Sequence, residues 1–285
     1  MADAITGNTE LGATKQDLVA SLVQRELAFN AKLLPYFTDV SAFAIPGARS
    51  ISFPKLTSFT VVDRAEGVAG DATALTATVD QLNLDVNAYV AWVIDAMTKK
   101  QANIAVEIEF AKRAAAAHGR YVDSQLISNL ASGAYLFMNV GADVDVTYDN
   151  LVDMQEAYLT GNGLIEQGAW ICSIQQNKAL VSLAEFKDTS AFGEMVIRDG
   201  YVKQILGMPV VLSNGLAGKE LYLAGKESLA IGFQSGAQMD EQNANEYGVG
   251  AVRVAVDQLF GIKPLQTGLL GAAAGKSRLI IGLND

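Results

Sequence analysis

The chain has 285 residues, of which 50% are hydrophobic and only 18% are charged, whereas charged residues make up about a quarter of an average soluble chain. The formal net charge is −10, and basic residues adjoin only as the pairs 99–100 and 112–113. We therefore exclude a protein that wraps nucleic acid by neutralising its phosphates. No run of about 18 apolar residues occurs, which excludes a membrane-spanning helix. Subunit interfaces best explain the surplus of apolar residues.

The N-terminal region is expected to be an arm. Residues 1–13 are small and polar and are predicted to be disordered. They lack the basic start and apolar run of a secretory signal, so we expect no signal peptide. A helix is predicted from Thr14, and residues 31–48, with two prolines, are predicted to form an extended connector. Cys172 is the only cysteine, which excludes an intrachain disulfide and fits a reducing compartment.

Two stretches alternate apolar and polar residues with a period of two, the pattern of strands. The first covers about 49–62, and the second covers 82–96, where thirteen positions from Leu82 to Ile94 alternate. At ~3.3 Å per residue the second strand is about 40 Å long. The segment between them is rich in Gly, Ala and Thr. We predict that 49–96 is one projecting hairpin with a flexible tip. Because a lone two-stranded ribbon of this length is marginally stable in water, another copy of the chain is expected to cover it.

A very long helix is predicted next. Apolar residues recur at intervals of three and four over about 28 residues, and Ser132-Gly133 ends the pattern. Glu109 precedes Arg113 by four residues, which is the favourable order for a helical ion pair. The only histidine, His118, falls on the apolar stripe and is interpreted as a core or interface residue. The stripe consists of Ile104, Ile108, Ala111, Ala115, Val122, Leu126 and Leu130.

The second half of the chain mixes shorter helices and strands. Helices are predicted at 150–159, before Gly161, and at 177–186. Strands are predicted at 170–174, 201–213, 229–233, 251–256 and 278–281. Pro209 predicts that its strand lies at a sheet edge or that the strand begins near this residue. Since the order has no regular strand–helix–strand rhythm, the fold class is α+β.

Three local sequences then resemble the tailed-phage major capsid proteins of the Hong Kong 97-type fold. The run Ile205-Leu-Gly-Met-Pro-Val-Val-Leu-Ser-Asn214, preceded by 186–193 and Gly200, is similar to the family's I-x-G-x-x-V-x-x-S-N strand. The strand 170–174 with the helix 177–186 resembles the elements that precede that run. The stretch 252–264 is similar to the family's late strand. The resemblance covers about residues 15–285 in order.

The resemblance implies an arrangement in five segments. These are an N-terminal arm (1–48), an extended β-hairpin loop (49–99), a long spine helix with the first part of a peripheral domain (100–147), an axial domain (148–225) and the returning strands of the peripheral domain (226–285). It further implies self-assembly into pentamers and hexamers of an icosahedral shell that encloses double-stranded DNA, in a virion assembled in the host cytoplasm. Scaffolding, portal and decoration proteins are the further partners that it allows. No membrane partner is implied.

The residues expected to carry function are therefore interface residues. Aromatic residues are predicted to anchor the hairpin and charged residues to pair with neighbouring copies: Phe53, Phe59 and Trp92, and Arg49, Lys55, Asp63, Arg64 and Glu66. Some relatives form a covalent Lys–Asn crosslink. Although Lys55 lies on the candidate loop, no acid catalyst is located, so no crosslink is predicted.

Residue patterns of enzymes are incomplete in this sequence. There is no G-x-S-x-G nucleophile elbow, and one histidine with one cysteine makes a zinc site a poor interpretation. Residues 271–277 resemble a phosphate-binding loop but are one residue short of its spacing. Acidic residues near 143–149 and 240–246 do not follow the calcium-loop pattern. We predict no catalytic, cofactor-binding or metal-binding residues.

Three alternatives stay open on the sequence. The first is an encapsulin-like compartment shell, which shares the fold but encloses an enzyme. The second is a soluble α+β enzyme, for which the sequence offers no complete motif. The third is a bacterial surface or adhesion protein, which the missing signal peptide disfavours.

Overall fold

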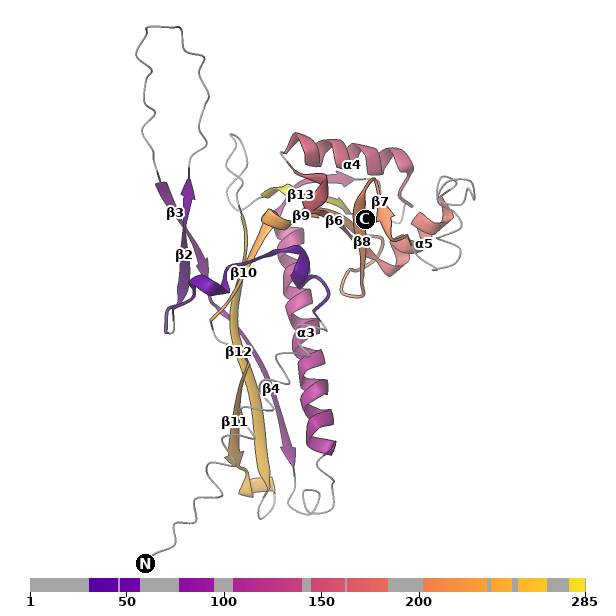
Figure 1. Ribbon diagram of the computed structural model, residues 1–285. Coiled ribbons are helices and arrows are strands. Elements are labelled where there is room, and N and C mark those ends of the chain that lie inside the picture. Colours follow the sequence, from indigo (N-terminus) through magenta and orange to yellow (C-terminus); the bar gives the residue numbers. More distant parts are fainter. Residues whose placement is uncertain are drawn as a thin grey trace, which may run out of the picture.

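The computed structural model describes residues 31–45, 47–56, 77–94, 105–139, 145–161, 163–183, 202–234, 237–247, 251–265 and 277–284. The predicted N-terminal helix and the predicted hairpin tip lie outside these residues. Strands and helices of the described part build two lobes and a hairpin (Figure 1). The mixed α+β class is confirmed.

The first lobe is elongated and consists of one long helix against a five-stranded sheet. Helix α3 (Ala105–Gly133) runs alongside the sheet over most of its length (Figure 1). The central strand of the sheet is β12 (Val252–Pro264). Its partners are β4 (Val86–Ile94) on one side, β11 (Gln238–Asn243) and β10 (Leu229–Phe233) successively on the other, and β1 (Thr38–Asp39) outside β10.

The second lobe lies beside one end of α3 and contains a six-stranded sheet in the order β5-β13-β9-β6-β8-β7. Its strands are β5 (Ala134–Asn139), β13 (Ser277–Asn284), β9 (Leu221–Gly225), β6 (Gly168–Ser173), β8 (Met208–Ser213) and β7 (Gln204–Ile205). Two helices accompany the sheet, α4 (Tyr148–Thr160) and α5 (Ile174–Ser182). Every residue of β6 is buried, as expected for a strand in the middle of a covered sheet.

The core continues from one lobe into the other around the end of α3. Leu126 and Leu130 of the helix pack with Ile171 of β6 and Phe260 of β12, all fully buried. A separate cluster around Trp170 and Tyr158 fills the second lobe. Because both sheets share the α3 residues, this helix fixes the position of one lobe against the other.

The predicted long helix is confirmed almost to the residue. Its stripe is buried from Ala111 through Ala115, His118 and Val122 to Leu130. The predicted ion pair is also present, with Arg113 Nε 3.3 Å from Glu109 Oε1 on the exposed face. Asp123 of the same helix is half-buried. Its carboxylate accepts hydrogen bonds from the backbone N–H groups of Lys32, at 3.1 Å, and Leu33, at 3.2 Å.

The prediction of a single strand at 82–96 is wrong. The structure has two strands there, β3 (Ala77–Asn83) and β4, separated by Leu84 and Asp85. Only β3 forms the hairpin, with β2 (Ser50–Leu56), while β4 joins the five-stranded sheet beside β12. Part of the long ribbon is therefore covered by its own chain. Apolar alternation continues across the break, because Leu82, Leu84 and Ala88 are all buried.

Candidate subunit interface

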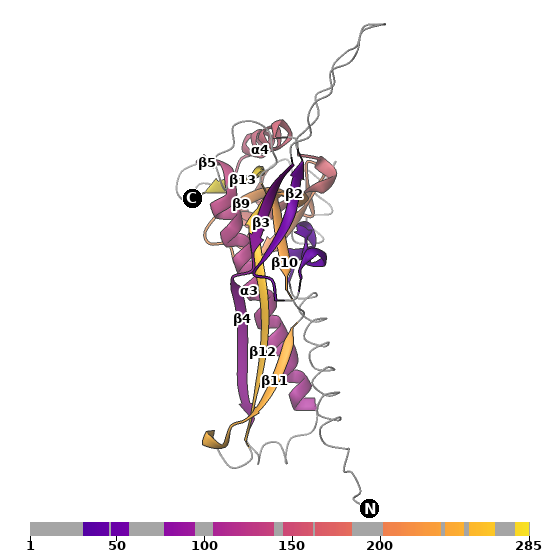
Figure 2. The same cartoon turned by 90° about the vertical axis from the view of Figure 1, so that its left-hand side faces the viewer.

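Within the described residues, the hairpin β2–β3 packs on the five-stranded sheet at its base. Ile51 and Leu82 are register partners in the hairpin and are both buried. They pack with Val40 and Ala230 in a small cluster below the hairpin. Figures 1 and 2 show the two strands crossing beside β10 and the adjoining part of β12 and then continuing away from the sheet. The hairpin is thus anchored at one end.

One hydrogen bond closes this base and two others tie it to the sheet. The Leu84 N–H donates to the Arg49 carbonyl at 2.9 Å and closes the hairpin at its root. The Lys263 ammonium donates to the Gln81 carbonyl at 2.8 Å, and the Gln234 amide donates to the Ala48 carbonyl at 2.7 Å. Because two of these bonds come from β12 and from the residue after β10, the sheet fixes the direction in which the hairpin leaves.

The edges of the hairpin are open in the described part of the chain. No described strand other than β2 and β3 belongs to this two-stranded sheet. Val79 of β3 has 67% of its surface exposed. A two-stranded sheet presents two rows of backbone groups without strand partners, which is a ready template for another chain.

Of the eight predicted interface residues, the structure places four. Arg49 is exposed at the hairpin root. Phe53 and Lys55 lie on β2, where their register partners are Asp80 and Thr78. Phe59, Asp63, Arg64 and Glu66 lie outside the described residues. The roles of these residues in subunit contacts stay predictions.

Trp92 is not on the hairpin, which corrects its predicted position. It lies on β4 opposite Val254 of β12 and faces α3, where its ring stacks on Phe110 with the ring centroids 6.5 Å apart. Together with Ala111 and Ala115 it belongs to a small apolar cluster of its own chain. The small alanine side chains allow the indole to approach the helix. Within one subunit, Trp92 attaches the far end of β4 to α3.

A second surface, which was not predicted from the sequence, lies on the face of the five-stranded sheet that points away from α3. Register partners share a face, so Tyr89 and Val93 of β4 lie on this side, with 52% and 41% of their surfaces exposed. Arg253 of β12 lies across the sheet and donates to the Tyr89 hydroxyl at 2.6 Å. Its guanidinium carbon is 6.0 Å from the Tyr89 ring centroid. The Ala91–Ala255 pair between them leaves room for this contact.

A third surface lies on the second lobe, where large apolar side chains are exposed near the end of α4. Leu159, Leu164 and Ile165 have 42%, 59% and 40% of their surfaces exposed, and they come within seven sequence positions. Grouped apolar exposure of this kind marks contact surfaces more often than isolated apolar residues do. The sequence contains a signal for this surface, because 159–165 spans the predicted end of the helix at Gly161 and includes three large apolar residues.

The described residues contain no arrangement of reactive side chains that resembles an active site. No group of three or more His, Cys, Asp or Glu residues in the described ranges could hold a metal ion. Burial raises the pKa of the Cys172 thiol to about 12 and lowers the pKa of His118. Both changes favour the neutral groups and remove the thiolate nucleophile. Among the described helices, none is long and apolar enough to cross a membrane.

Comparison with known proteins agrees with this geometry at the level of the fold. No protein-family model and no curated protein matches the sequence. Solved structures do match. A structure of Mycobacterium phage Che8 has a TM-score of 0.65 and 16% identity, covering 83% of this chain and 85% of that one. The capsid of cyanophage P-SCSP1u has a TM-score of 0.66 and 14% identity, covering 87% and 86%.

This chain has the fold of a tailed-phage capsid subunit. The Hong Kong 97-type architecture expected from the order of elements is therefore confirmed. A virus-like particle from Pyrococcus furiosus has a TM-score of 0.61 and 11% identity, and the match covers 95% of this chain and 99% of that one. The capsid-type fold thus spans nearly the whole chain. The predicted division into five segments stays a prediction.

Proposed function

We propose that this chain is the major capsid protein of a tailed bacteriophage. Many identical copies form pentamers and hexamers, which close into an icosahedral shell around double-stranded DNA. The observation that carries this proposal is the capsid-subunit fold along more than four fifths of the chain, combined with a hairpin whose described strands pack on the sheet at their base. The role is structural, and the fold offers no competing catalytic arrangement among its described residues.

Open backbone edges and exposed apolar residues support self-assembly. In the part of the chain that the structure describes, the hairpin edges have no strand partner, and the Tyr89 and Leu164 surfaces lie on different lobes. A subunit in a closed shell contacts several neighbours at once, so it needs several separate contact surfaces. One chain that carries three such surfaces fits a shell better than it fits a simple dimer, which needs one.

The charge of the chain supports a container for DNA rather than a DNA-binding protein. A net charge of −10 opposes tight binding to phosphates. A shell protein of this charge confines nucleic acid without holding it, which leaves the polymer free to be packed and released. Scaffolding, portal and decoration proteins are further partners in this proposal, and the host cytoplasm is the place of assembly.

A second candidate function is a protein compartment without a genome. The likeness to the Pyrococcus furiosus virus-like particle, which is covered to 99% of its length, favours it. The two functions share the shell and differ in its contents.

Negative-stain imaging of the purified chain tests the shell itself. Closed particles or rings of five and six subunits are expected, whereas a monodisperse monomer at micromolar concentration would contradict both functions. Nuclease-protected DNA in particles isolated from the native source would support the phage capsid, and protected protein cargo without DNA would support the compartment.

Deletion of residues 65–78 tests the role of the hairpin. The shortened chain is expected to stay soluble and to assemble poorly. Unchanged particle yield from this deletion would remove the hairpin from its proposed role, and imaging with light scattering measures both outcomes.

A further inference from the structure

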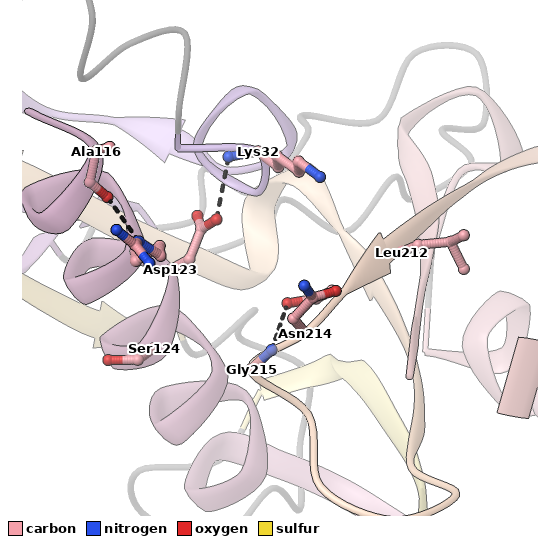
Figure 3. Close-up of a pocket in the computed structure, with 9 residues that line it drawn as sticks. Lys32, Ala116, Asp123, Ser124, Leu212, Asn214 and Gly215 are labelled. Carbon is pink, nitrogen blue, oxygen red and sulfur yellow. Dashed lines mark hydrogen bonds between the residues drawn. The ribbon is translucent and has the colours of Figure 1, made fainter. Parts of the chain in front are cut away.

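A pocket of about 340 Å³ lies between the middle of α3, the segment before the 3-10 turn Leu34–Tyr36, and the turn after β8. It lies apart from the hairpin and from the open face of the sheet. Arg120 and Asp123 of α3 line one side, Lys32 lies on the connector, and Leu212 and Asn214 lie on the opposite side (Figure 3). The pocket therefore brings together three segments that are distant in the sequence.

Asp123 supplies the single carboxylate among the residues that line this pocket, and both of its oxygens accept hydrogen bonds. Its two oxygens accept the backbone N–H groups of Lys32 and Leu33 at 3.1 and 3.2 Å. Burial raises the pKa of Asp123, and those backbone bonds together with the Lys32 ammonium oppose the change. The carboxylate thus holds the connector against α3, and it makes no ion pair with Arg120 in the described part of the chain.

Two cations remain available to a ligand. The Arg120 Nε donates to the Ala116 carbonyl at 3.1 Å within its own helix, which fixes the base of the guanidinium. Its terminal nitrogens form no ion pair within the described residues. The Lys32 ammonium also forms none there, and it acts on the Asp123 carboxylate only through longer-range attraction. Figure 3 shows the Lys32 side chain extending away from Asp123 toward the side of Leu212 and Asn214. Both positive charges therefore flank the same space.

The remaining walls supply an amide and apolar surface. Asn214 is exposed, while the neighbouring Ser213 is 7% exposed and its hydroxyl accepts the Gly215 N–H at 3.2 Å. Ala116 and Leu212 contribute aliphatic surface. An arginine fork, an ammonium and an amide around an aliphatic wall suit a carboxylate on a short apolar stem. Glutamate and aspartate side chains have this form.

We propose that this pocket binds carboxylate side chains of an acidic peptide segment of a partner protein. A peptide is favoured over nucleic acid because polyanion binding requires many phosphate contacts along a groove, whereas this chain is acidic overall and the pocket offers two cations. Recognition of acidic motifs by a small group of basic side chains is a common mode of peptide binding. The site stands independently of the proposed shell function.

Fluorescence anisotropy with the full chain tests the site. The probe is a dye-labelled peptide of alternating glutamate and alanine, compared with the same peptide carrying glutamine and with a single-stranded oligonucleotide of equal charge. The acidic peptide is expected to bind, and Arg120→Gln and Lys32→Gln are each expected to weaken it about tenfold. Arg113→Gln is the matched control, because Arg113 is exposed on the same helix outside the pocket and pairs with Glu109.

Four results would overturn the proposal. They are absence of measurable binding to the wild-type chain, equal binding by both pocket variants and wild type, equal affinity for the glutamine peptide, and tighter binding of the oligonucleotide with the same dependence on Arg120. The last result would assign the pocket to phosphates. Circular dichroism of each variant separates loss of binding from loss of folding.

Discussion

Gly232 of β10 and Gly261 of β12 are register partners, and the hairpin crosses the sheet directly over this pair. A Cβ atom at position 261 would lie 1.9 Å from the Asn83 carbonyl oxygen, and one at position 232 would lie 2.5 Å from Ile51 Cδ1. Position 261 needs glycine because the hairpin backbone approaches the sheet there more closely than a side chain allows, whereas position 232 faces the end of the Ile51 side chain. The pair creates the flat site on which the hairpin base rests.

Substitution of these glycines is expected to destabilise the hairpin base to different extents. Gly261→Ala meets backbone and should lower the free energy of unfolding by about 3 kcal/mol, whereas Gly232→Ala meets the end of a side chain and should cost about 1 kcal/mol. Adding Ile51→Val removes the obstructing methyl group and should restore part of the Gly232→Ala loss. Urea unfolding of the unassembled chain measures all three. Equal effects of the two alanines would contradict the close approach of Asn83.

The glycine pair illustrates what the sequence could not provide. A glycine within a strand pattern signals a close approach of some group, but it does not identify the group, and Asn83 is far away in sequence. The apolar–polar alternation of the sequence likewise predicted which residues of 82–94 are buried. It could not predict that Leu84 and Asp85 separate two strands of different sheets. Periodicity depends on burial, whereas strand pairing depends on distant partners.

Trp92 is expected to stabilise the individual subunit. Trp92→Ala should lower the free energy of unfolding of the unassembled chain by about 2 kcal/mol, because it removes a ring packed against Phe110 and the Ala111 face of α3. Trp92→Phe should change little, since it keeps an aromatic ring and removes a buried indole N–H that has no hydrogen-bond partner among the described residues. Chemical unfolding under conditions that prevent assembly is the measurement.

Tyr89→Ala is the matched control, because Tyr89 lies on the opposite face of the same strand. It should change the unfolding free energy by less than about 0.5 kcal/mol and yet slow assembly followed by light scattering. If Trp92→Ala instead left unfolding unchanged and blocked assembly, Trp92 would be an interface residue, as the sequence predicted.

The long helix and the buried strand 168–173 were predictable for a physical reason. Both elements bury residues in a regular pattern that local sequence encodes, as with Ala111, Ala115 and Val122 on α3. The pocket was not predictable, because Lys32 and Arg120 are brought together by the Asp123 carboxylate across about 90 residues. Contacts between residues so distant in the chain produce no periodic pattern in the sequence.

The stability of the folded chain is expected to fall as the pH drops below about 6.5, and His118 should account for part of this fall. Burial lowers the pKa of His118 in the folded chain, while the nearby Val256 backbone and the Asp257 carboxylate act in the opposite direction. Below the unfolded value of 6.5 the unfolded chain therefore binds a proton that the folded chain does not. Above that value the histidine contributes no pH dependence.

His118→Leu isolates this effect, because the chain has a single histidine. The variant should be at least as stable as wild type at neutral pH, since two buried polar ring nitrogens are replaced by an apolar side chain. Its unfolding free energy should change less between about pH 7 and pH 5.5. Urea titrations at several pH values give both slopes. Identical slopes would show that His118 takes up its proton equally in both states.

Cys172 is expected to be inert in the folded chain and reactive in the unfolded chain. Its side chain has no exposed surface, and it lies on β6 between register partners Leu212 of β8 and Leu221 of β9. Burial raises the pKa of its thiol to about 12, so the reactive thiolate is scarce at pH 8. A chromogenic disulfide reagent should label the native chain only at the rate of unfolding and should label the urea-unfolded chain immediately.

A Cys172→Ala chain carrying Ser128→Cys is the matched control. Ser128 lies on the exposed face of α3, so this cysteine should react at once in both states. Rapid labelling of native Cys172 would contradict the central position of β6 in the second lobe.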